Sequence, residues 1–430
     1  MPDCRRARQS SIVIRKIGGV LAYFKGQKNA SYDFPALTIM NLSTASSGRR
    51  ARISIGIIAW NEERAIGPML QSLFGQTLFA ELARRRQRCE IVCIANGCTD
   101  STAALAREIF SAQAESHPHA ESFTARVAEI RERGKINAWN LFVHSLSAGE
   151  ADYLCLMDAD IVIRHPETLW NMVLTLENRA EANVSVDCPR KDIEFKPAKR
   201  WRDRISLAMT ELTRSSRAQM CGQLYCIRAA VARNIYLPRH LTACDDGFIK
   251  ALVCTDFLAH PPWPMRIQTA KGAEHTFEAY TSSRSVIRNQ KRQIIGQTIV
   301  HLLVDRYLPG LPPLQRSKLA DTLKRLEQED PDWLKRLIRQ HVQGARFFWQ
   351  LYPGLLTHRF KRLSELGFGQ AMVRLPAVLA GWVFTVCGGV AAFKALRDGQ
   401  TGYWPRADRS RFRLSLEGEV PLAPLKHSER

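Results

Sequence analysis

The stretch ISIGIIAWNEERAIGPML, residues 53–70, decides the predicted fold. Residues 53–60 form a short apolar run rich in β-branched side chains, which is typical of a buried strand. After Asn61-Glu62-Glu63, apolar side chains recur at helical spacing, at Ile66, Met69, Leu70 and Leu73. The stretch therefore predicts a buried strand that leads directly into a helix, as in the first half of a βαβ unit.

Three later stretches continue this organisation. Residues 90–95 are strand-like and end at the turn Asn96-Gly97, after which Asp100 or Ser101 can cap a helix. Residues 125–131 predict a third strand, residues 133–146 a helix, and residues 153–157 a fourth strand that runs into Asp158-Ala159-Asp160. Strands and helices alternating at this spacing predict an α/β fold with a doubly wound, mostly parallel sheet flanked by helices.

The composition excludes a mainly disordered or collagen-like chain. Of the 430 residues, 45% are hydrophobic and 24% are charged, which is typical of a folded globular protein. The net charge of +21 favours an anionic partner: a nucleic acid, an acidic lipid or a phosphorylated substrate. The eleven cysteines include no CxxC pair, which argues against structural zinc. We expect buried, reduced thiols of a cytosolic protein, as in the apolar runs around Cys93, Cys155, Cys254 and Cys387.

The two ends of the chain differ from its centre. Residues 1–50 are a basic tail, in which residues 10–28 are either an amphipathic helix on an anionic membrane or disordered. The apolar stretch 17–24 is short and interrupted by two glycines, so it does not predict a signal peptide. We expect the catalytic α/β domain over residues 51–300, a helical region interrupted at Pro331 over 301–370, and a second basic tail over 397–430.

A membrane segment is predicted between these last two regions, at residues 371–396. Residues 375–393 carry no charge, and nineteen helical residues span about 28 Å against a hydrocarbon core of roughly 30 Å. The segment is therefore transmembrane or membrane-embedded, and a buried or re-entrant hairpin is the alternative, because Pro376 and Gly388-Gly389 interrupt it. Positive charges flank both sides, so they do not set an orientation.

Three polar segments follow predicted strands: residues 60–63, 96–100 and 158–160. Ligands of doubly wound sheets bind at the carboxyl ends of the strands, so these segments form the candidate site. Asp158 and Asp160 offer hard oxygen ligands for Mg²⁺ or Mn²⁺, which in turn can accept diphosphate oxygens. A turn capped by the two aspartates is the structural alternative. Asn96 and Asp100 either bind a nucleobase or ribose, or serve the turn and the helix cap.

Three further segments carry candidate residues. Lys135 either contacts a phosphate or holds Asp160 in place, and a solvated helix lysine is the alternative. Asp245-Asp246 supplies either a general base or the cap of the following helix. The basic stretch at residues 288–293 either steadies a diphosphate or forms a solvated helix face.

Taken in order, these segments resemble the family 2 glycosyltransferases with the GT-A fold. AWNEE (59–63) looks like the motif of the family's first strand, and IANGCTDST (94–102) is similar to DDGSTDGT. GKINAWN (134–140) resembles GKAxALN, and LMDADI (156–161) is close to the metal-binding DxD. CDDGF (244–248) resembles the ED motif, and RNQKRQ (288–293) is a degraded QxxRW with Asn289, Arg292 and Gln293 at its fixed positions. The likeness covers about residues 51–300.

The resemblance implies an inverting, metal-dependent sugar transfer. A nucleotide-diphosphate sugar would bind across the residues Trp60, Asn61, Glu63, Asn96, Asp100, Lys135, Asp158 and Asn289. Asp160, with Asp158 nearby, would hold Mg²⁺ or Mn²⁺ on the donor diphosphate. Asp246 would be the general base, with Asp245 and Arg292 completing the catalytic set. Ala95-Asn96 replaces the family's acidic pair that reads uracil, and Gln293 replaces Trp, which favours a single transfer over a processive synthase. His275 is either a further site residue or, as is more common for a lone histidine in a polar loop, neither a ligand nor an acid.

The partners follow from the same reasoning. The apolar segment and its basic flanks favour a lipid or lipid-linked glycan acceptor at the cytoplasmic face of the inner (plasma) membrane. One alternative is a sugar-phosphate nucleotidyltransferase, but the first strand lacks a Gly-rich basic signature. A second is a non-catalytic basic protein that binds membrane or nucleic acid. No nucleic-acid motif is present and the cations are spread along the chain, so no specific nucleic-acid partner is expected.

Overall fold

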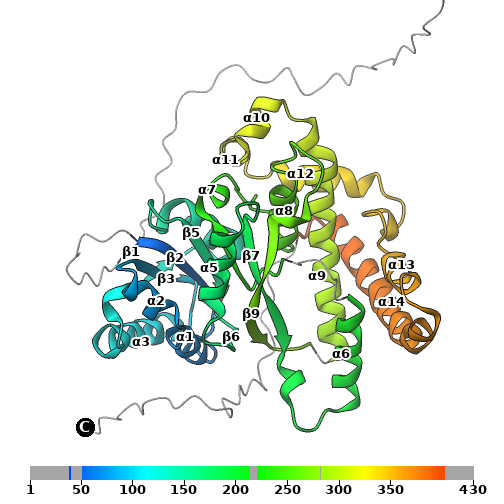
Figure 1. The fold of residues 1–430 in the computed structure, drawn as a ribbon. Helices are drawn as coiled ribbons and strands as arrows, with labels where there is room; N and C mark the ends of the chain where they lie inside the picture. Colours follow the sequence, from blue (N-terminus) through cyan, green and yellow to red (C-terminus); the bar gives the residue numbers. More distant parts are fainter. Residues whose placement is uncertain (1–37, 40–50, 214–219, 281, 402–430) are drawn as a thin grey trace, which may run out of the picture. The chain divides into compact units, whose positions relative to one another are not determined.

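A computed structural model describes residues 38–39, 51–213, 220–280 and 282–401 (Figure 1). All of them belong to one compact unit, residues 38–430. Its centre is a nine-stranded sheet with the order β1-β4-β3-β2-β5-β8-β7-β9-β6. The strands are β1 Thr38–Ile39, β2 Ala51–Ala59, β3 Arg88–Asn96, β4 Phe123–Ile130, β5 Tyr153–Asp158, β6 Val162–Ile163, β7 Val184–Lys191, β8 Leu224–Arg228 and β9 Ile267–Phe277.

The four strands predicted from the sequence form the parallel part of the sheet. β4, β3, β2 and β5 are neighbours in that order, and each adjacent pair is parallel. One face of these strands is covered by α1 Ile66–Phe74, α2 Leu78–Arg84 and α3 Thr102–Ser116, and the predicted apolar face of α1 is buried there. Helix α4 Lys135–Leu141 and the turn η2 Phe142–Leu146 cover the other face. Helices on both faces confirm the predicted doubly wound α/β class.

The rest of the sheet is mixed rather than parallel. β8 lies antiparallel between β5 and β7, β7 pairs parallel with β9, and β6 pairs antiparallel with β9. Strands β7 and β9 escaped the sequence analysis because their apolar residues are interrupted by charged and polar ones, and β8 escaped it because its apolar run is only four residues long. One consequence is that His275 lies on β9, fully buried, and not in a polar loop as expected.

Helices dominate the chain after β9, as predicted. The remaining α-helices are α5 Thr168–Asn178, α6 Trp201–Thr213, α7 Ala229–Ala232, α8 Asp245–Cys254, α9 Ser283–His301, α10 Pro313–Ser317, α11 Leu319–Glu329, α12 Trp333–Gln343, α13 His358–Ser364 and α14 Phe368–Arg397. Short helical turns are η1 Ala120–Ser122, η3 Asp192–Phe195, η4 Pro264–Arg266, η5 Leu302–Tyr307, η6 Leu308–Gly310 and η7 Phe348–Gln350. The break between α11 and α12 falls at the predicted Pro331.

Helix α14 contains the predicted membrane segment. Among the described residues it is the one helix long and apolar enough to cross a membrane, judged by length and composition alone. It packs against α9, α12, α13 and α6. Its Cys387 is exposed, against expectation, because it lies on the side of α14 that faces away from these helices, whereas Cys93, Cys155 and Cys254 are buried as predicted. The expectations for residues 10–28, and for most of both basic tails, fall outside the described residues.

Gly56 on β2 offers a test of how α4 and η2 lie on the sheet. A Cβ atom at this position would come within 2.7 Å of the Phe142 ring. We expect Gly56→Ala to lower the free energy of unfolding by about 1–3 kcal/mol, because an extra methyl group overfills the core. Chemical denaturation measures this, with Gly149→Ala as the control, since a Cβ there meets no atom within 4 Å. Equal stability of the two variants would contradict the packing described.

Candidate active site

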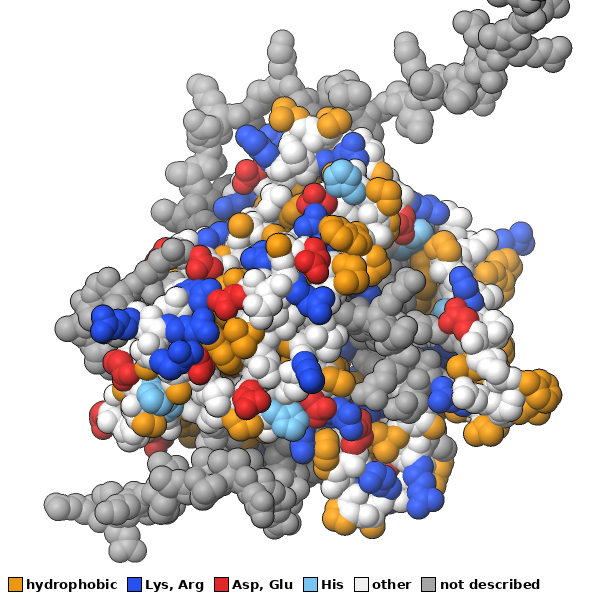
Figure 2. All heavy atoms as spheres, in the orientation of Figure 1, with side chains coloured by type: hydrophobic (Ala, Val, Ile, Leu, Met, Phe, Trp, Pro, Cys, Tyr) orange, Lys and Arg blue, Asp and Glu red, His pale blue; other side chains and the backbone are white. Residues whose placement is uncertain are grey.

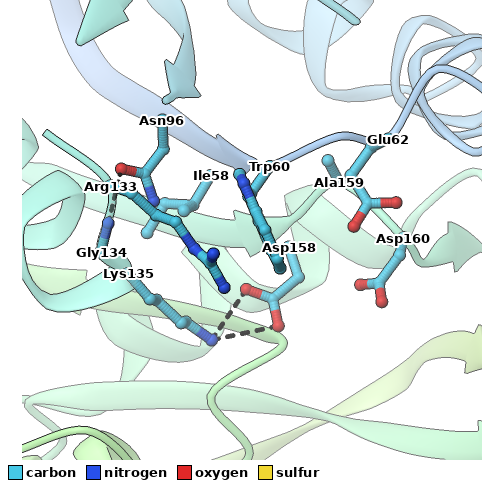
Figure 3. Close-up of a pocket in the computed structure, with 10 residues that line it drawn as sticks. All are labelled: Ile58, Trp60, Glu62, Asn96, Arg133, Gly134, Lys135, Asp158, Ala159 and Asp160. Carbon is cyan, nitrogen blue, oxygen red and sulfur yellow. Dashed lines mark hydrogen bonds and ion pairs between the residues drawn. The ribbon is translucent and has the colours of Figure 1, made fainter. Parts of the chain in front are cut away.

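A pocket opens at the carboxyl ends of β2, β3 and β5 (Figure 3). Strand order reverses here, because the chain builds β3 and β4 on one side of β2 and then places β5 on the other. In doubly wound sheets such a switch point is where ligands bind. The pocket is lined by Ile58, Trp60, Glu62, Asn96, Arg133, Gly134, Lys135, Asp158, Ala159 and Asp160.

Five of the residues predicted for the site line this pocket: Trp60, Asn96, Lys135, Asp158 and Asp160. Asn96 Oδ1 accepts a hydrogen bond of 2.9 Å from the backbone N–H of Gly134, which joins the end of β3 to the start of α4. The Arg133 guanidinium lies 3.5 Å from the centre of the Trp60 ring, and Figure 3 shows the two side chains stacked at the pocket. The pocket thus combines an aromatic surface, a cation and carboxylates.

Lys135 joins two acidic motifs that are far apart in the sequence. Its Nζ lies 2.8 and 3.1 Å from the two carboxylate oxygens of Asp158, 3.1 Å from the carbonyl oxygen of Gly222 and 3.9 Å from Asp245 Oδ2. Burial by itself would lower the pKa of Lys135, but the carboxylates of Asp158, Asp245 and Asp246 outweigh it and raise the pKa. The lysine is therefore charged, and it holds Asp158 rather than Asp160, the residue that the sequence suggested.

The two aspartates of the DAD turn occupy different surroundings. Burial raises the pKa of Asp158 to about 7, Lys135 opposes the rise, and Asp160 adds to it. Burial also raises the pKa of Asp160, while Lys135, His275 and Arg292 oppose that rise. Figure 3 shows Asp160 pointing into the pocket on the side of Glu62.

The donor set of the pocket suits a hard divalent cation. Carboxylate oxygens are the ligands that Mg²⁺ and Mn²⁺ prefer, and such ions commonly use one or two carboxylates and take their other ligands from phosphates and water. No group of three or more His, Cys, Asp or Glu side chains able to hold a metal occurs among the residues that the structure describes. A cation here would therefore rely on Asp160, with Asp158 beside it, and on oxygen atoms from a bound ligand.

Asp245 and Asp246 form the first turn of α8. The helix begins after Cys244, which adopts a left-handed backbone conformation with φ of 58°, so the aspartates do not cap the helix as the alternative had suggested. Burial, followed by the charge of Asp245, raises the pKa of Asp246 to about 6, although hydrogen bonds from the backbone of Gly247 and Gly222 oppose the rise. Such a carboxylate is ionised at neutral pH and more basic than an ordinary aspartate.

Helix α9 brings the basic stretch to the same place. The charge of Arg292 acts on Asp160, and its guanidinium donates a hydrogen bond of 3.1 Å to Asn289 Oδ1. Gln293 Oε1 lies 3.1 Å from Cys244 Sγ. A Cβ atom at Gly296 would lie 2.7 Å from the Ala243 carbonyl, so glycine permits the close contact between α9 and the chain just before Asp245.

The remaining predicted residues support the loops beside the pocket. Asn61 Oδ1 accepts a hydrogen bond of 2.8 Å from the N–H of Thr99, and Glu63 accepts one of 3.4 Å from the N–H of Ser101. Asp100 accepts hydrogen bonds from the N–H groups of Thr102 and Glu63, at 3.1 and 3.3 Å. Asp100, and not Ser101, therefore caps α3, and none of these three predicted residues lines the pocket.

Three residues near the site were missed by the sequence analysis, namely Glu62, Arg133 and Asp187, and the position of a fourth, His275, was predicted wrongly. Glu62 and Arg133 line the pocket, and the only sequence signal for them was their position inside the AWNEE motif and next to GKINAWN. His275 Nδ1 lies 2.6 Å from Asp187 Oδ2, with both side chains fully buried, and the charge of His275 acts on Asp160. No local pattern signalled this pair, because it depends on β9 pairing with both β7 and β6.

Comparison with known proteins gives a family match for part of the chain. Residues 54–233 match the family model described as glycosyl transferase family 2. No curated protein sequence matches the chain. This match favours sugar transfer over the nucleotidyltransferase and over the non-catalytic alternative.

Several solved structures are similar. A mannosyltransferase from Pyrobaculum calidifontis, PcManGT in complex with GDP-Man and Mn²⁺, is 16% identical, with a TM-score of 0.45 over 80% of this chain and 88% of that one. Residues 1–349 of S. aureus TarS are 15% identical, with a TM-score of 0.39 over 81% of this chain and 92% of that one. Glucosyl-3-phosphoglycerate synthase from Mycobacterium tuberculosis, in complex with Mn²⁺, UDP-glucose and phosphoglyceric acid, is 19% identical. Its TM-score is 0.34 over 59% of this chain and 79% of that one.

Replacing Lys135 tests its contact with the two acidic motifs. Lys135→Met leaves Asp158 and Asp245 without their cation, so we expect a loss of about 3 kcal/mol in unfolding free energy at pH 8. The loss should shrink at pH 5, where Asp158 can take up a proton. Chemical denaturation at both pH values measures it. The control is Lys335→Met, at a lysine whose side chain is 38% exposed, and it should lower the unfolding free energy by less than about 0.5 kcal/mol. An equally small loss for Lys135→Met would refute the contact.

The raised pKa of Asp246 predicts a particular pH dependence. Between about pH 4 and pH 6 the folded chain keeps a proton on Asp246 that the unfolded chain loses, so this group makes stability fall as pH rises. We expect the stability of Asp246→Asn relative to wild type to increase by about 1–3 kcal/mol across this window. Asp321→Asn, at an exposed position on α11, serves as the control. Parallel stability curves for wild type and Asp246→Asn would contradict the raised pKa.

Proposed function

Because residues 54–233 match the family model of glycosyl transferase family 2, we propose that the pocket binds a nucleotide-diphosphate sugar and transfers the sugar, with inversion, to an acceptor hydroxyl. The observation that carries this proposal is the meeting of the DAD turn, Lys135 and Asp245-Asp246 at the carboxyl ends of β2, β3 and β5. Carboxylates that far apart in the chain are brought together at a switch point of the sheet.

The donor would lie along the rim formed by β2, β3 and α4. Trp60 and Arg133 offer a stacked surface for a nucleobase, and Asn96 at the end of β3 offers an amide beside it. Asp158 would contact the ribose. Asn61, Glu63 and Asp100 would shape this part of the site through the loop contacts described above, and Lys135 would contribute positive charge near the diphosphate. Asn289 would act by holding Arg292.

The diphosphate would require a divalent cation. Asp160 would hold Mg²⁺ or Mn²⁺, with Asp158 beside it, and the ion would neutralise the negative charge that develops on the leaving nucleoside diphosphate. Arg292, whose charge already acts on Asp160, would add to that neutralisation. The support for this assignment is the pair of carboxylates, Asp158 and Asp160, that line the pocket.

Asp246 would serve as the general base. Its raised pKa lets it accept the proton of the acceptor hydroxyl at neutral pH, and Asp245 sustains that pKa through its charge. The hydroxyl oxygen then forms a bond to the anomeric carbon as the bond from that carbon to the diphosphate oxygen breaks. A single displacement from the opposite side inverts the configuration at the anomeric carbon.

The acceptor would be a lipid or lipid-linked glycan at the cytoplasmic face of the inner membrane. Helix α14 provides an apolar surface, and the net charge of +21 suits an anionic membrane. Gln293, which stands where related sequences carry Trp and which contacts Cys244 beside the acidic pair, favours transfer of one sugar.

A panel of nucleotide sugars, each with and without Mn²⁺, tests the proposal by thermal shift and by product analysis. We expect at least one donor to stabilise the wild type in the presence of metal, by about 2.7 kcal/mol at a hundredfold excess over the dissociation constant. Asp160→Asn should lose the metal-dependent part of that shift. Asp246→Asn should keep the shift but lose about 10²–10⁴-fold in transfer rate.

Asp321→Asn on α11 is the matched control and should behave as the wild type in both measurements. The proposal would be wrong if no donor stabilised the chain, or if Asp246→Asn transferred sugar at the wild-type rate.

A further inference from the structure

Helix α14 carries an exposed apolar stripe on one side. Val373, Pro376, Leu379, Val383, Cys387 and Val390 are all exposed and recur every three or four residues, which places them on one face, and the exposed Met372 lies next to them. Val373 is 81% exposed, and Phe368 at the start of the helix is 84% exposed. Contiguous apolar surface of this kind marks a site of interaction in a protein that is otherwise well packed.

The opposite side of α14 is fixed to the catalytic part of the chain. Most of its buried positions are small, and only Val378 and Leu396 are larger: the small ones are Gly381, Thr385, Gly388, Gly389, Ala392 and Ala395. A Cβ atom at Gly388 would lie 2.8 Å from Gln290 Cβ, so α14 rests directly on α9. Thr385 Oγ1 also accepts a hydrogen bond of 3.4 Å from Arg359 Nε, at the start of α13. Small residues at the contact indicate an interface built for close approach.

Helix α9 is too polar to enter the hydrocarbon core of a membrane. It carries Arg284, Arg288, Gln290, Lys291, Arg292 and Gln293. Each Arg or Lys costs about 2.5–3.5 kcal/mol or more at the centre of a bilayer. A helix that lies along α9 cannot cross the membrane without leaving this contact. An orientation parallel to the membrane surface keeps the contact and still covers the apolar stripe.

Exposed cations surround the stripe. Lys361 on α13 and Lys394 and Arg397 at the end of α14 are exposed. The exposed acidic residues next to them are Glu365, just after α13, and Asp398, just after α14. Helix α6, which also packs against α14, begins with Trp201, 66% exposed, and is accompanied by the exposed residues Lys196, Arg200 and Arg204. Figure 2 shows apolar side chains gathered over the outer ends of α6, α13 and α14, with Lys and Arg beside them. Aromatic and apolar side chains with flanking cations fit an anionic lipid surface.

We propose that α14 lies in the plane of an anionic bilayer, with its exposed apolar stripe in the lipid and its small-residue side on α9, and that it does not span the membrane. This inference rests on the proposed function, because the membrane-bound acceptor is part of that proposal. Helix α9 also carries Arg292 and contacts the chain before Asp245 through Gly296, so it lies between the lipid-facing helix and the acidic pair. The bilayer surface would thereby be held at a fixed position relative to the general base.

Vesicle flotation of the full chain, without any sugar donor, tests the proposal. We expect the wild type to float with vesicles of phosphatidylcholine and phosphatidylglycerol, and to float much less with phosphatidylcholine alone or in 0.5 M salt. Leu379→Glu combined with Val383→Glu should reduce flotation at least tenfold. Leu314→Glu, which places the same charge at a 74% exposed leucine on α10, is the matched control and should float as the wild type does.

A second measurement distinguishes an in-plane helix from a crossing one. Alkaline carbonate should release the wild type from membranes of expressing cells, because it extracts surface-bound proteins, and retention would overturn the in-plane arrangement. Undiminished flotation of the double variant would overturn the role of the stripe, as would a wild-type chain that dimerises through the stripe and does not float. The donor-induced thermal shift of the double variant should stay at the wild-type value, so failure of flotation and failure of sugar-donor binding are separate results.

Discussion

The ammonium group of Lys135 is the interaction on which the pocket depends. Asp158 and Asp245 come from β5 and α8, and their charges would repel each other if no cation lay between them. Lys135 supplies that cation from the first residue of α4, and its ammonium group also donates a hydrogen bond to the Gly222 carbonyl oxygen. Lys135 does not fully neutralise the carboxylates, because the pKa values of Asp158 and Asp246 stay raised. Raised carboxyl pKa values at a concave site are typical of catalytic machinery, where a stronger base is useful and a bound cation can complete the neutralisation.

The sequence predicted those parts of the molecule that depend on local patterns. β2, β3 and β5 are continuous apolar runs because both of their faces are covered, and their polar ends mark the switch point without further information. The mixed part of the sheet was not predictable in this way. β9 places a buried His275 beside Asp187 only because of its register with β7, and that register joins residues 88 apart in the sequence. Likewise, the partner of Lys135 depends on the rotation of α4 against β5, so the sequence could name the lysine and not its carboxylate.

Composition and structure answer different questions about α14. Nineteen uncharged residues satisfy the length requirement for a membrane crossing, and no count of apolar residues distinguishes a crossing helix from one that lies flat. The distinction comes from the neighbours of the helix. Glycines at 388 and 389, which weaken the prediction of a crossing helix, are the positions at which α14 approaches Gln290 and Phe348 most closely. They are therefore packing residues, and the same substitutions that would favour a free membrane helix would disturb this contact.

Helix α9 contacts both the catalytic pocket's acidic pair region and the apolar helix α14. One of its sides meets Cys244 through Gly296 and Gln293, directly before the acidic pair, and another supports α14 at Gly388. The same helix carries Arg292, whose charge acts on Asp160, so the contact with α14 and the contacts beside the acidic pair belong to one element. A chain that acts on a membrane-bound acceptor benefits from such a connection, since the depth at which the acceptor hydroxyl sits is then matched to the position of the base. Gln293 makes this contact short and polar, because its Oε1 lies 3.1 Å from Cys244 Sγ.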